Sequence, residues 1–329
     1  ETMQRSFADL EYQGKKKTTR RERFLDDIES ITPWTALVAE LEGYYPRSGG
    51  RGRPPIGLER MLRMYIAQQC FGFSDEATED SIYDSQAIRA FVGIDLAREA
   101  APDATTLLKF RRLLESNGLT QRIFEAINAH LAEQGLMLRE GTVVDATIIA
   151  APPSTKNQDR ARDPEMHQTR KGNQYYFGMK AHVGTDAASG LVHSVKATAA
   201  NVADVTQAGE LLHGNETKAF GDAGYQGVSK RSEHADSDVD WHVAMKRQDR
   251  KRLSDDERGR TLETCEQIKA KIRSRVEHPF QVLKSRFQHR KARYRGIAKN
   301  EAQLFTLFGL ANLVLAQRRL ATYSGGGVC

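Results

Sequence analysis

Three acidic residues lie in sequence surroundings where a carboxylate needs a positive charge or hydrogen-bond donors to stabilise it. Asp145 lies inside an apolar, β-branched run, and Asp222 lies in the small-residue segment Ala219–Gly224. Glu277 is the one acid among eleven Lys and Arg residues between positions 269 and 299. A buried carboxylate is costly unless a metal ion, a cation or several N–H donors compensate it. These three acids are therefore the candidate metal ligands.

Carboxylates brought together from separate elements suit the chemistry of phosphodiester hydrolysis and transesterification. Those reactions need charge stabilisation and an activated hydroxyl, and two Mg²⁺ ions about 3.5–4 Å apart supply both. Mg²⁺ prefers hard oxygen ligands and takes one or two carboxylates for each ion. We therefore expect Asp145, Asp222 and Glu277 to hold two Mg²⁺ ions, with Mn²⁺ able to substitute.

Each of these acids also has a purely structural explanation. An Asp at a strand end is often a turn or cap residue, which applies to Asp145 and Asp222. Glu277 follows Arg273 by four positions, the spacing of a helical ion pair worth about 0.2–0.5 kcal/mol. Pro279 cannot make the helical N–H hydrogen bond, so a kink is expected just past Glu277.

The elements before the first acid are expected to be helical. Apolar residues recur there at spacings of three and four, the period of an amphipathic helix. Ser74 and Asp103 stand where N-caps begin helices. The pattern predicts an all-helical domain over residues 1–138, with helices at 22–44, 57–72, 103–116 and 120–134.

The elements that carry the acids are expected to be mixed. Strands are predicted at 142–149, 217–222 and 238–245, with a hairpin at 175–185 and 191–198 after a polar loop, 153–173. Helices are predicted from Asp204 to Leu212, at 264–288 and at 301–320. The order strand, hairpin, helix, strand, strand, helix predicts an α/β core with a mixed sheet over residues 139–329.

Composition limits the class of protein. The chain has 329 residues, enough for two domains, and 39% are hydrophobic, enough for a sizeable core. Its three cysteines, Cys70, Cys265 and Cys329, form no metal-spaced pair, so reduced thiols are expected. The apolar runs are too short to span a membrane, and charged residues interrupt the first segment where a signal peptide would stand. A cytoplasmic protein is expected.

The charge distribution predicts a polyanionic partner. A formal charge of +6 is a weak signal, but the one-sided run from 269 to 299 repels itself unless a polyanion neutralises it. Nucleic acid is the usual polyanion, and a solvated helix face is the alternative. The candidate phosphate contacts in this run are Arg273, Arg275, His278 and Lys284.

Two further segments are candidates for DNA contact. Gly50–Pro55 resembles the Arg-Gly-Arg-Pro core of AT-hook segments, in which Arg51 and Arg53 would enter the A·T minor groove. A Pro/Gly linker is the alternative explanation. The helices near 57–70 and 103–115 could hold a helix-turn-helix, whose second helix carries the basic residues Lys109, Arg111 and Arg112.

At the acids the chain resembles the DDE transposases of bacterial insertion sequences, in particular the group typified by insertion sequence five. That group's motif is an Arg, three residues, a Glu, six residues and a Lys, which Arg273, Glu277 and Lys284 match. Ala270 stands where a Tyr is usual. Val143–Thr147 and Gly221–Tyr225 resemble the segments that carry the two aspartates, and the similarity runs over most of the chain.

The resemblance implies a function and a fold. It implies an RNase H-like catalytic domain over 139–329, with a charged insertion at about 228–262, preceded by a helical domain for DNA binding and dimerisation. In such an enzyme a metal-activated water cuts the element's inverted-repeat end, and the released 3′-hydroxyl attacks target DNA. A homodimer on double-stranded DNA, associated with the bacterial nucleoid, is implied.

Two other functions fit the same features. One is a DNA-binding repressor derived from a transposase and lacking catalysis. The other is an RNase H-like nuclease that cuts DNA without joining it.

Overall fold

The computed structural model describes residues 14–47, 54–158, 160–234 and 238–325, and it divides into two compact units. The first unit comprises Glu1–Ile127 with Gln317–Cys329, and the second comprises Asn128–Ala316. The division passes through two helices, so the predicted boundary at residue 138 falls inside the second unit.

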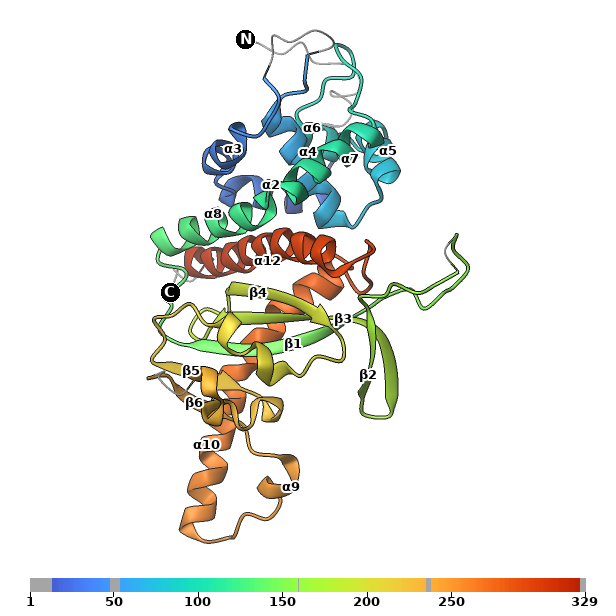
Figure 1. Cartoon of the computed structure of the whole chain (residues 1–329). Coiled ribbons are helices and arrows are strands. Elements are labelled where there is room, and N and C mark those ends of the chain that lie inside the picture. The colour runs from blue at the N-terminus through green and yellow to red at the C-terminus, as the bar shows by residue number, and fades with distance from the viewer. Residues whose placement is uncertain (1–13, 48–53, 159, 235–237, 326–329) are drawn as a thin grey trace. The chain divides into compact units, whose positions relative to one another are not determined.

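The first unit is helical, as predicted. Its elements are α2 (Arg20–Ile31), α3 (Trp34–Glu42), α4 (Leu58–Phe71), α5 (Asp75–Asp84), α6 (Gln86–Val92), α7 (Ala104–Ser116) and the first half of α8 (Leu119–Glu133) (Figure 1). The predicted caps are confirmed, because the Ser74 hydroxyl accepts the Ala77 N–H and the Asp103 carboxylate accepts the Thr106 N–H.

The single helix predicted over 22–44 is wrong. Thr32 is extended, with φ −76° and ψ 127°, and it separates α2 from α3. The cause is Pro33, since the residue before a proline is disfavoured in the helical region. The short helix α6 was not predicted.

The second unit is built on a six-stranded mixed sheet, which confirms the predicted core. The strands are β1 (Thr142–Ala150), β2 (His167–Lys171), β3 (Gln174–Asp186), β4 (Val192–Ala199), β5 (Lys218–Gly221) and β6 (Asp240–Val243). The order is β2-β3-β1-β5-β6, with β4 also paired to β3. Strand β2 lies in the segment predicted to be a loop.

The register of β1 and β5 positions two of the acids. The strands are parallel, with Val144 paired to Gly221. Asp145 and Asp222 each follow the paired residues by one position. They therefore lie at neighbouring places in the sheet, toward the carboxyl end of β5.

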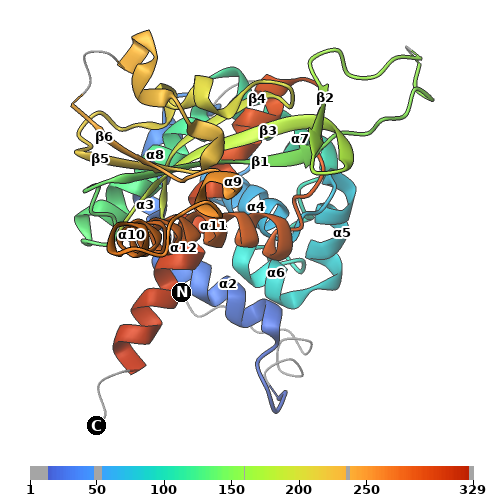
Figure 2. The ribbon, with the colours of Figure 1, turned by 90° about the horizontal axis from the view of Figure 1, so that it is seen from below.

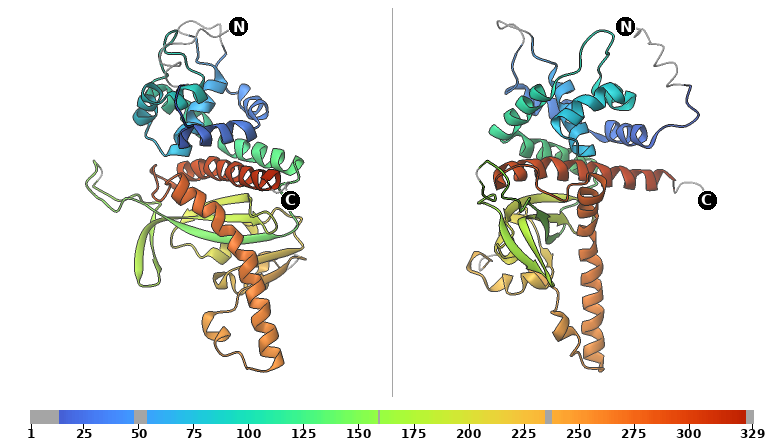
Figure 3. Two further views of the ribbon diagram at one scale, coloured as in Figure 1. Left: turned by 180° about the vertical axis from the view of Figure 1, so that it is seen from behind. Right: turned by 90° about the vertical axis from the view of Figure 1, so that its right-hand side faces the viewer.

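The helical elements of this unit are α9 (Arg247–Arg250), α10 (Glu257–Arg273), α11 (Glu277–Gln281) and most of α12 (Ile297–Gly325). Helices α10 and α11 lie along one face of the sheet, and the turns between β4 and β6 lie on the other (Figures 2 and 3). On the face of those turns, Val144 packs in a buried cluster with Ala208, Leu211, Tyr225 and Val228. The predicted insertion at 228–262 contains β6, α9 and the start of α10.

Two predicted helices differ from the structure. The segment from Asp204 forms two short 3₁₀ turns, Asp204–Gln207 and Gly209–Leu211. The helix predicted over 264–288 is instead α10, a 3₁₀ turn at Ser274–Val276, α11 and a π-helical turn at Val282–Arg286. The hydrogen-bonding pattern therefore changes on both sides of Glu277.

Among the described residues, no helix is long and apolar enough to cross a membrane. Of the cysteines, Cys70 is buried and Cys265 is exposed. Cys329 lies outside the described residues.

Candidate metal centre

Asp145 is the electrostatic centre of the candidate site. Burial raises the pKa of its carboxyl to about 7, and one backbone hydrogen bond, from the Ala146 N–H at 2.7 Å, opposes that rise. The negative charges of Asp222, Glu277 and Asp204 raise the pKa further. Coulombic effects of this kind require short separations. The fold thus places Asp222 and Glu277 close enough for their charges to act on Asp145, and it adds a fourth acid, Asp204.

Asp222 stands immediately after β5, in the exposed start of a 3₁₀ turn. Its Oδ1 accepts the Gly224 N–H at 2.8 Å, so it is a turn-capping residue as well as a candidate ligand. A Cβ on Gly224 would lie 2.9 Å from that oxygen, and a Cβ on Gly221 would lie 2.9 Å from the Cβ of Tyr225. Both small residues are therefore needed for the backbone to present this carboxylate.

Glu277 is exposed and begins α11. The 3₁₀ turn before it contacts β1. Lys284, seven residues on, donates from Nζ to the Thr147 hydroxyl and, at 3.1 Å, to the Ile148 carbonyl. Burial lowers the pKa of Lys284, and the charges of Glu277 and Asp145 act in the opposite direction. Lys284 therefore connects the helix of Glu277 to the strand of Asp145.

Asp204 and Lys180 are site residues that the sequence did not indicate, because Asp204 was predicted only as the start of a helix. Lys180 lies on β3, and its Nζ donates to Asp204 Oδ1 at 2.9 Å and to the Val202 carbonyl at 2.7 Å. The signal that could have found them is Lys180 itself, a charge inside a largely apolar strand, because such a charge is seldom buried without a partner.

A buried tyrosine lies beside these acids. Tyr225 is fully buried, and its hydroxyl has no hydrogen-bond partner among the described residues. Burial and the charges of Asp204, Asp145 and Asp222 raise its pKa. Tyr225 is therefore a neutral phenol, and its side chain belongs to the buried cluster that packs against Val144 of β1.

The predicted phosphate contacts of the basic run divide into two groups. His278 is exposed next to Glu277, and Arg273 is partly exposed with no hydrogen-bond partner for its buried Nε among the described residues. Arg275 instead donates to the carbonyl of Ala187, in the turn between β3 and β4. Lys284 is bound to β1, as described above. Arg275 and Lys284 therefore bind other parts of the protein and stabilise the elements around the site.

In the helical unit, Arg111 does not fit the predicted DNA contact. It is 8% exposed, and its guanidinium forms a bidentate ion pair with Asp75, with one distance of 2.9 Å. Lys109 and Arg112 are exposed on α7. Two helices separate α4 from α7 in the chain, so they do not form the predicted helix-turn-helix. Arg51 and Arg53 lie outside the described residues.

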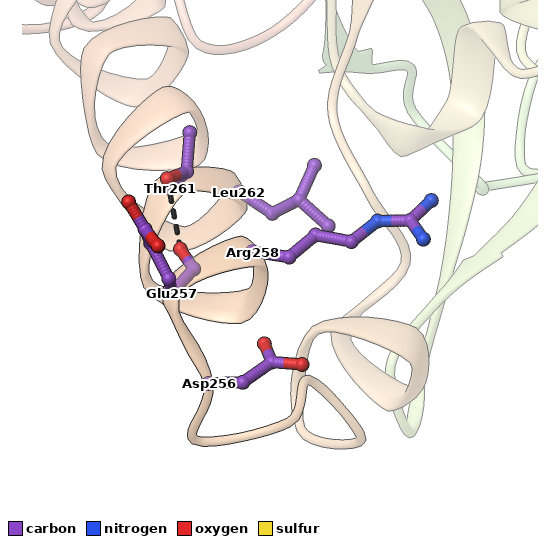
Figure 4. Close-up of a pocket in the computed structure, with 5 residues that line it drawn as sticks. All are labelled: Asp256, Glu257, Arg258, Thr261 and Leu262. Carbon is purple, nitrogen blue, oxygen red and sulfur yellow. Dashed lines mark hydrogen bonds between the residues drawn. The ribbon is translucent and has the colours of Figure 1, made fainter.

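A surface pocket at the start of α10 is separate from the acids. It is lined by Asp256, Glu257, Arg258, Thr261 and Leu262 (Figure 4). The 17 residues of α10 span about 25 Å at 1.5 Å per residue, and Glu277 follows the far end. This pocket does not contribute to the metal centre.

Comparisons with known proteins agree with the geometry. A family described as "Transposase DDE domain" matches residues 137–313, more than half of the chain, and one described as "Transposase domain (DUF772)" matches residues 13–113. A cryo-EM structure of a piggyBac transposase synaptic complex with hairpin DNA is 12% identical and covers 92% of this chain and 74% of that chain. Its TM-score is 0.45.

Proposed function

This chain belongs to the transposase DDE domain family, with the two matched domains of an insertion-sequence-type DDE transposase, and we propose that it cuts and joins DNA at the inverted-repeat ends of its own mobile element. The family implies use of a divalent metal and of DNA, and the fold is RNase H-like, as predicted. The observation that carries the proposal is the convergence of Asp222 and Glu277 on Asp145.

The donors at the centre fit Mg²⁺. All are carboxylate oxygens, the hard ligands that Mg²⁺ prefers. Burial, together with the charges of Asp222, Glu277 and Asp204, raises the pKa of Asp145 to about 7, and a divalent cation would stabilise the ionised carboxylates against both effects. We propose that Asp145, Asp222 and Glu277 hold two Mg²⁺ ions, with Mn²⁺ as a substitute. When bound, such ions activate the attacking hydroxyl and stabilise the charge on the phosphate.

The chain's own groups position this chemistry. Asp145 must lose its proton before its carboxylate can bind a cation, so metal binding at Asp145 competes with its protonation. Lys284 holds the Glu277 helix to β1 through Thr147 and Ile148. The Asp204–Lys180 pair holds a fourth charge close to Asp145 and Asp222.

Separate surfaces are proposed to hold DNA. Arg273 and His278 flank Glu277, where the cut phosphate must lie. Lys109 and Arg112 present exposed cations in the helical unit, which we propose, over residues 1–138, for DNA binding and dimerisation. Arg51 and Arg53 are proposed to enter the minor groove. Two element ends must meet for transposition, so a homodimer on DNA is proposed.

A cleavage and strand-transfer assay tests the proposal. Duplexes carrying the inverted repeats that flank the gene are incubated with the full chain and Mg²⁺. D145N, D222N and E277Q should abolish nicking while DNA binding is retained. D240N is the matched control, because Asp240 is an exposed acid on the same sheet, paired with His242, and it should cleave normally.

Other outcomes of the assay decide between the functions. Binding to the repeats without nicking in Mg²⁺ or Mn²⁺ would indicate a repressor. Nicking without transfer of pre-cut ends would indicate a nuclease. Full activity in any of the three acid variants would refute the site.

A further inference from the structure

A second cluster of metal-ligating side chains lies at the other end of the parallel strands. His193 is on β4, and His213 and Glu216 are in the loop that leads into β5. One ligand atom from each lies within 4.8 Å of the others. Asp222 follows Glu216 by six positions, about 20 Å of extended chain, so the cluster is distinct from the acid centre.

Glu216 provides a fixed, buried carboxylate. Its side chain is 0% exposed. Oε2 accepts the Gly214 N–H at 2.7 Å, and Oε1 accepts the Thr142 hydroxyl at 2.8 Å and the His213 N–H. Burial acts to raise the pKa of Glu216, but these hydrogen bonds outweigh it and the pKa is lowered. The loop therefore holds an ionised carboxylate in a buried place.

His213 presents its Nε2 to that carboxylate, while its Nδ1 accepts the Asn215 N–H at 3.3 Å, so a metal on Nε2 would move the ring proton to Nδ1 and displace that contact. The side chain is 7% exposed, and its Nε2 has no hydrogen-bond partner among the described residues. This nitrogen lies 3.4 Å from Glu216 Oε1. Two ligands of one tetrahedral Zn²⁺, each at about 2.0–2.2 Å, are separated by about 3.4 Å. The pair therefore has the spacing of two ligands that share an ion.

His193 completes the set. Its ring packs edge-on against the His213 ring, with centroids 4.9 Å apart. Nδ1 lies 2.9 Å from the Ser194 hydroxyl, and Nε2 lies 3.0 Å from the Thr142 hydroxyl oxygen. When Nδ1–H donates to Ser194, Nε2 carries a lone pair, and the single Thr142 proton is already donated to Glu216. A cation would satisfy that lone pair. An oxygen partner on the second ring nitrogen, as Ser194 provides, is the usual support for a histidine ligand.

We propose that His193, His213 and Glu216 form a Zn²⁺ site that is separate from the catalytic ions. Two imidazoles and one carboxylate are a known zinc ligand set, with a fourth position for the Thr142 hydroxyl or a water. The ion joins the loop before β5 to β4 and β1. It thereby fixes the strand that presents Asp222.

Zinc retention by the full chain tests the proposal. Protein stripped with a chelator is reloaded with Zn²⁺ alone, desalted and analysed for zinc, and affinity is measured against a chromophoric chelator. One zinc ion per chain is expected in wild type and in E277Q, which removes a catalytic acid. H213N keeps an acceptor for the Asn215 N–H, and E216Q keeps the carboxylate's shape. Each should lose about 100-fold or more in affinity.

The control is H289N, because His289 is another buried histidine whose ring nitrogens both lack partners among the described residues. It should retain one zinc ion. Should H213N and E216Q fail to fold, Co²⁺ added to wild type decides instead, since four-coordinate Co²⁺ absorbs strongly in the visible and six-coordinate Co²⁺ does not. No retained zinc in wild type, unchanged zinc in both variants, or a six-coordinate Co²⁺ spectrum would show a hydrogen-bonded cluster only.

Discussion

Asp145→Asn is expected to stabilise the metal-free protein at alkaline pH while it abolishes catalysis. The folded protein raises the pKa of Asp145 from 3.8 to about 7, mainly through burial. Each pKa unit corresponds to about 1.4 kcal/mol, which gives at most about 4 kcal/mol. The side chain is partly exposed, so solvent screening reduces the expected gain to about 2–4 kcal/mol.

The direction in which stability changes with pH follows from the protons bound by the folded and unfolded states. Between pH 4 and pH 7 the folded protein holds a proton on Asp145 that the unfolded chain has released, so wild-type stability falls as the pH rises through this window. The Asn variant has no such proton. Its stability should match wild type near pH 4 and exceed it above pH 7.

The assay is chemical and thermal unfolding of both proteins across pH 4–9 in a chelator, repeated with Mg²⁺. Mg²⁺ at pH 8 should stabilise wild type and leave D145N nearly unchanged, because a ligand that binds only the folded state stabilises it. Parallel pH profiles for the two proteins, or a variant less stable than wild type at pH 8.5, would refute a desolvated carboxylate at this position.

Three further predictions concern side-chain contacts in the two units. Asp204→Asn removes one of the charges that raise the pKa of Asp145, so Mg²⁺ binding, followed by calorimetry across pH, should set in at lower pH; an onset at the wild-type pH would contradict this. Lys284→Met should loosen the attachment of the Glu277 helix to β1 and lower kcat for end cleavage about 10–100-fold with little change in DNA affinity; weaker binding with unchanged kcat would instead mark Lys284 as a phosphate contact. Asp75→Ala should destabilise the helical unit by about 3 kcal/mol in thermal melts because it removes the bidentate carboxylate partner of the buried Arg111 and leaves Glu115 only at 3.7 Å, whereas Asp80→Ala, at an exposed position of the same helix, should not.

The long periodic segments and the alternating strands could be predicted from the sequence, because the pattern that marks them is local. The segment from Asp204 to Leu212 could not. Its apolar residues, among them Ala208 and Leu211, pack against Val144 of β1, and this tertiary contact favours two short turns over a regular helix.

The kink expected at Pro279 illustrates a different limit. The helix is interrupted earlier, at Ser274–Val276, so Pro279 falls in the first turn of α11. There its missing N–H has no helical partner to lose. The proline therefore costs no helical hydrogen bond, and the helix type changes on both sides of it, at Ser274–Val276 and at Val282–Arg286.

The candidate site was only partly predictable because some of its contacts join residues that are far apart in the sequence. The local surroundings of Asp145 and Glu277 mark them as acids that need compensation. The Lys180–Asp204 pair joins residues 24 positions apart, and the Arg111–Asp75 pair joins residues 36 apart. Only the folded structure shows which Lys and Arg side chains form ion pairs within the protein and which are exposed on its surface.

The most direct test of the central claim is a crystal structure of the full chain with Mn²⁺, in which anomalous scattering locates the ions. We predict peaks bounded by the carboxylates of Asp145, Asp222 and Glu277, and we expect these peaks to be lost from D145N crystals. Mn²⁺ bound elsewhere, with these three carboxylates free of it, would contradict the claim.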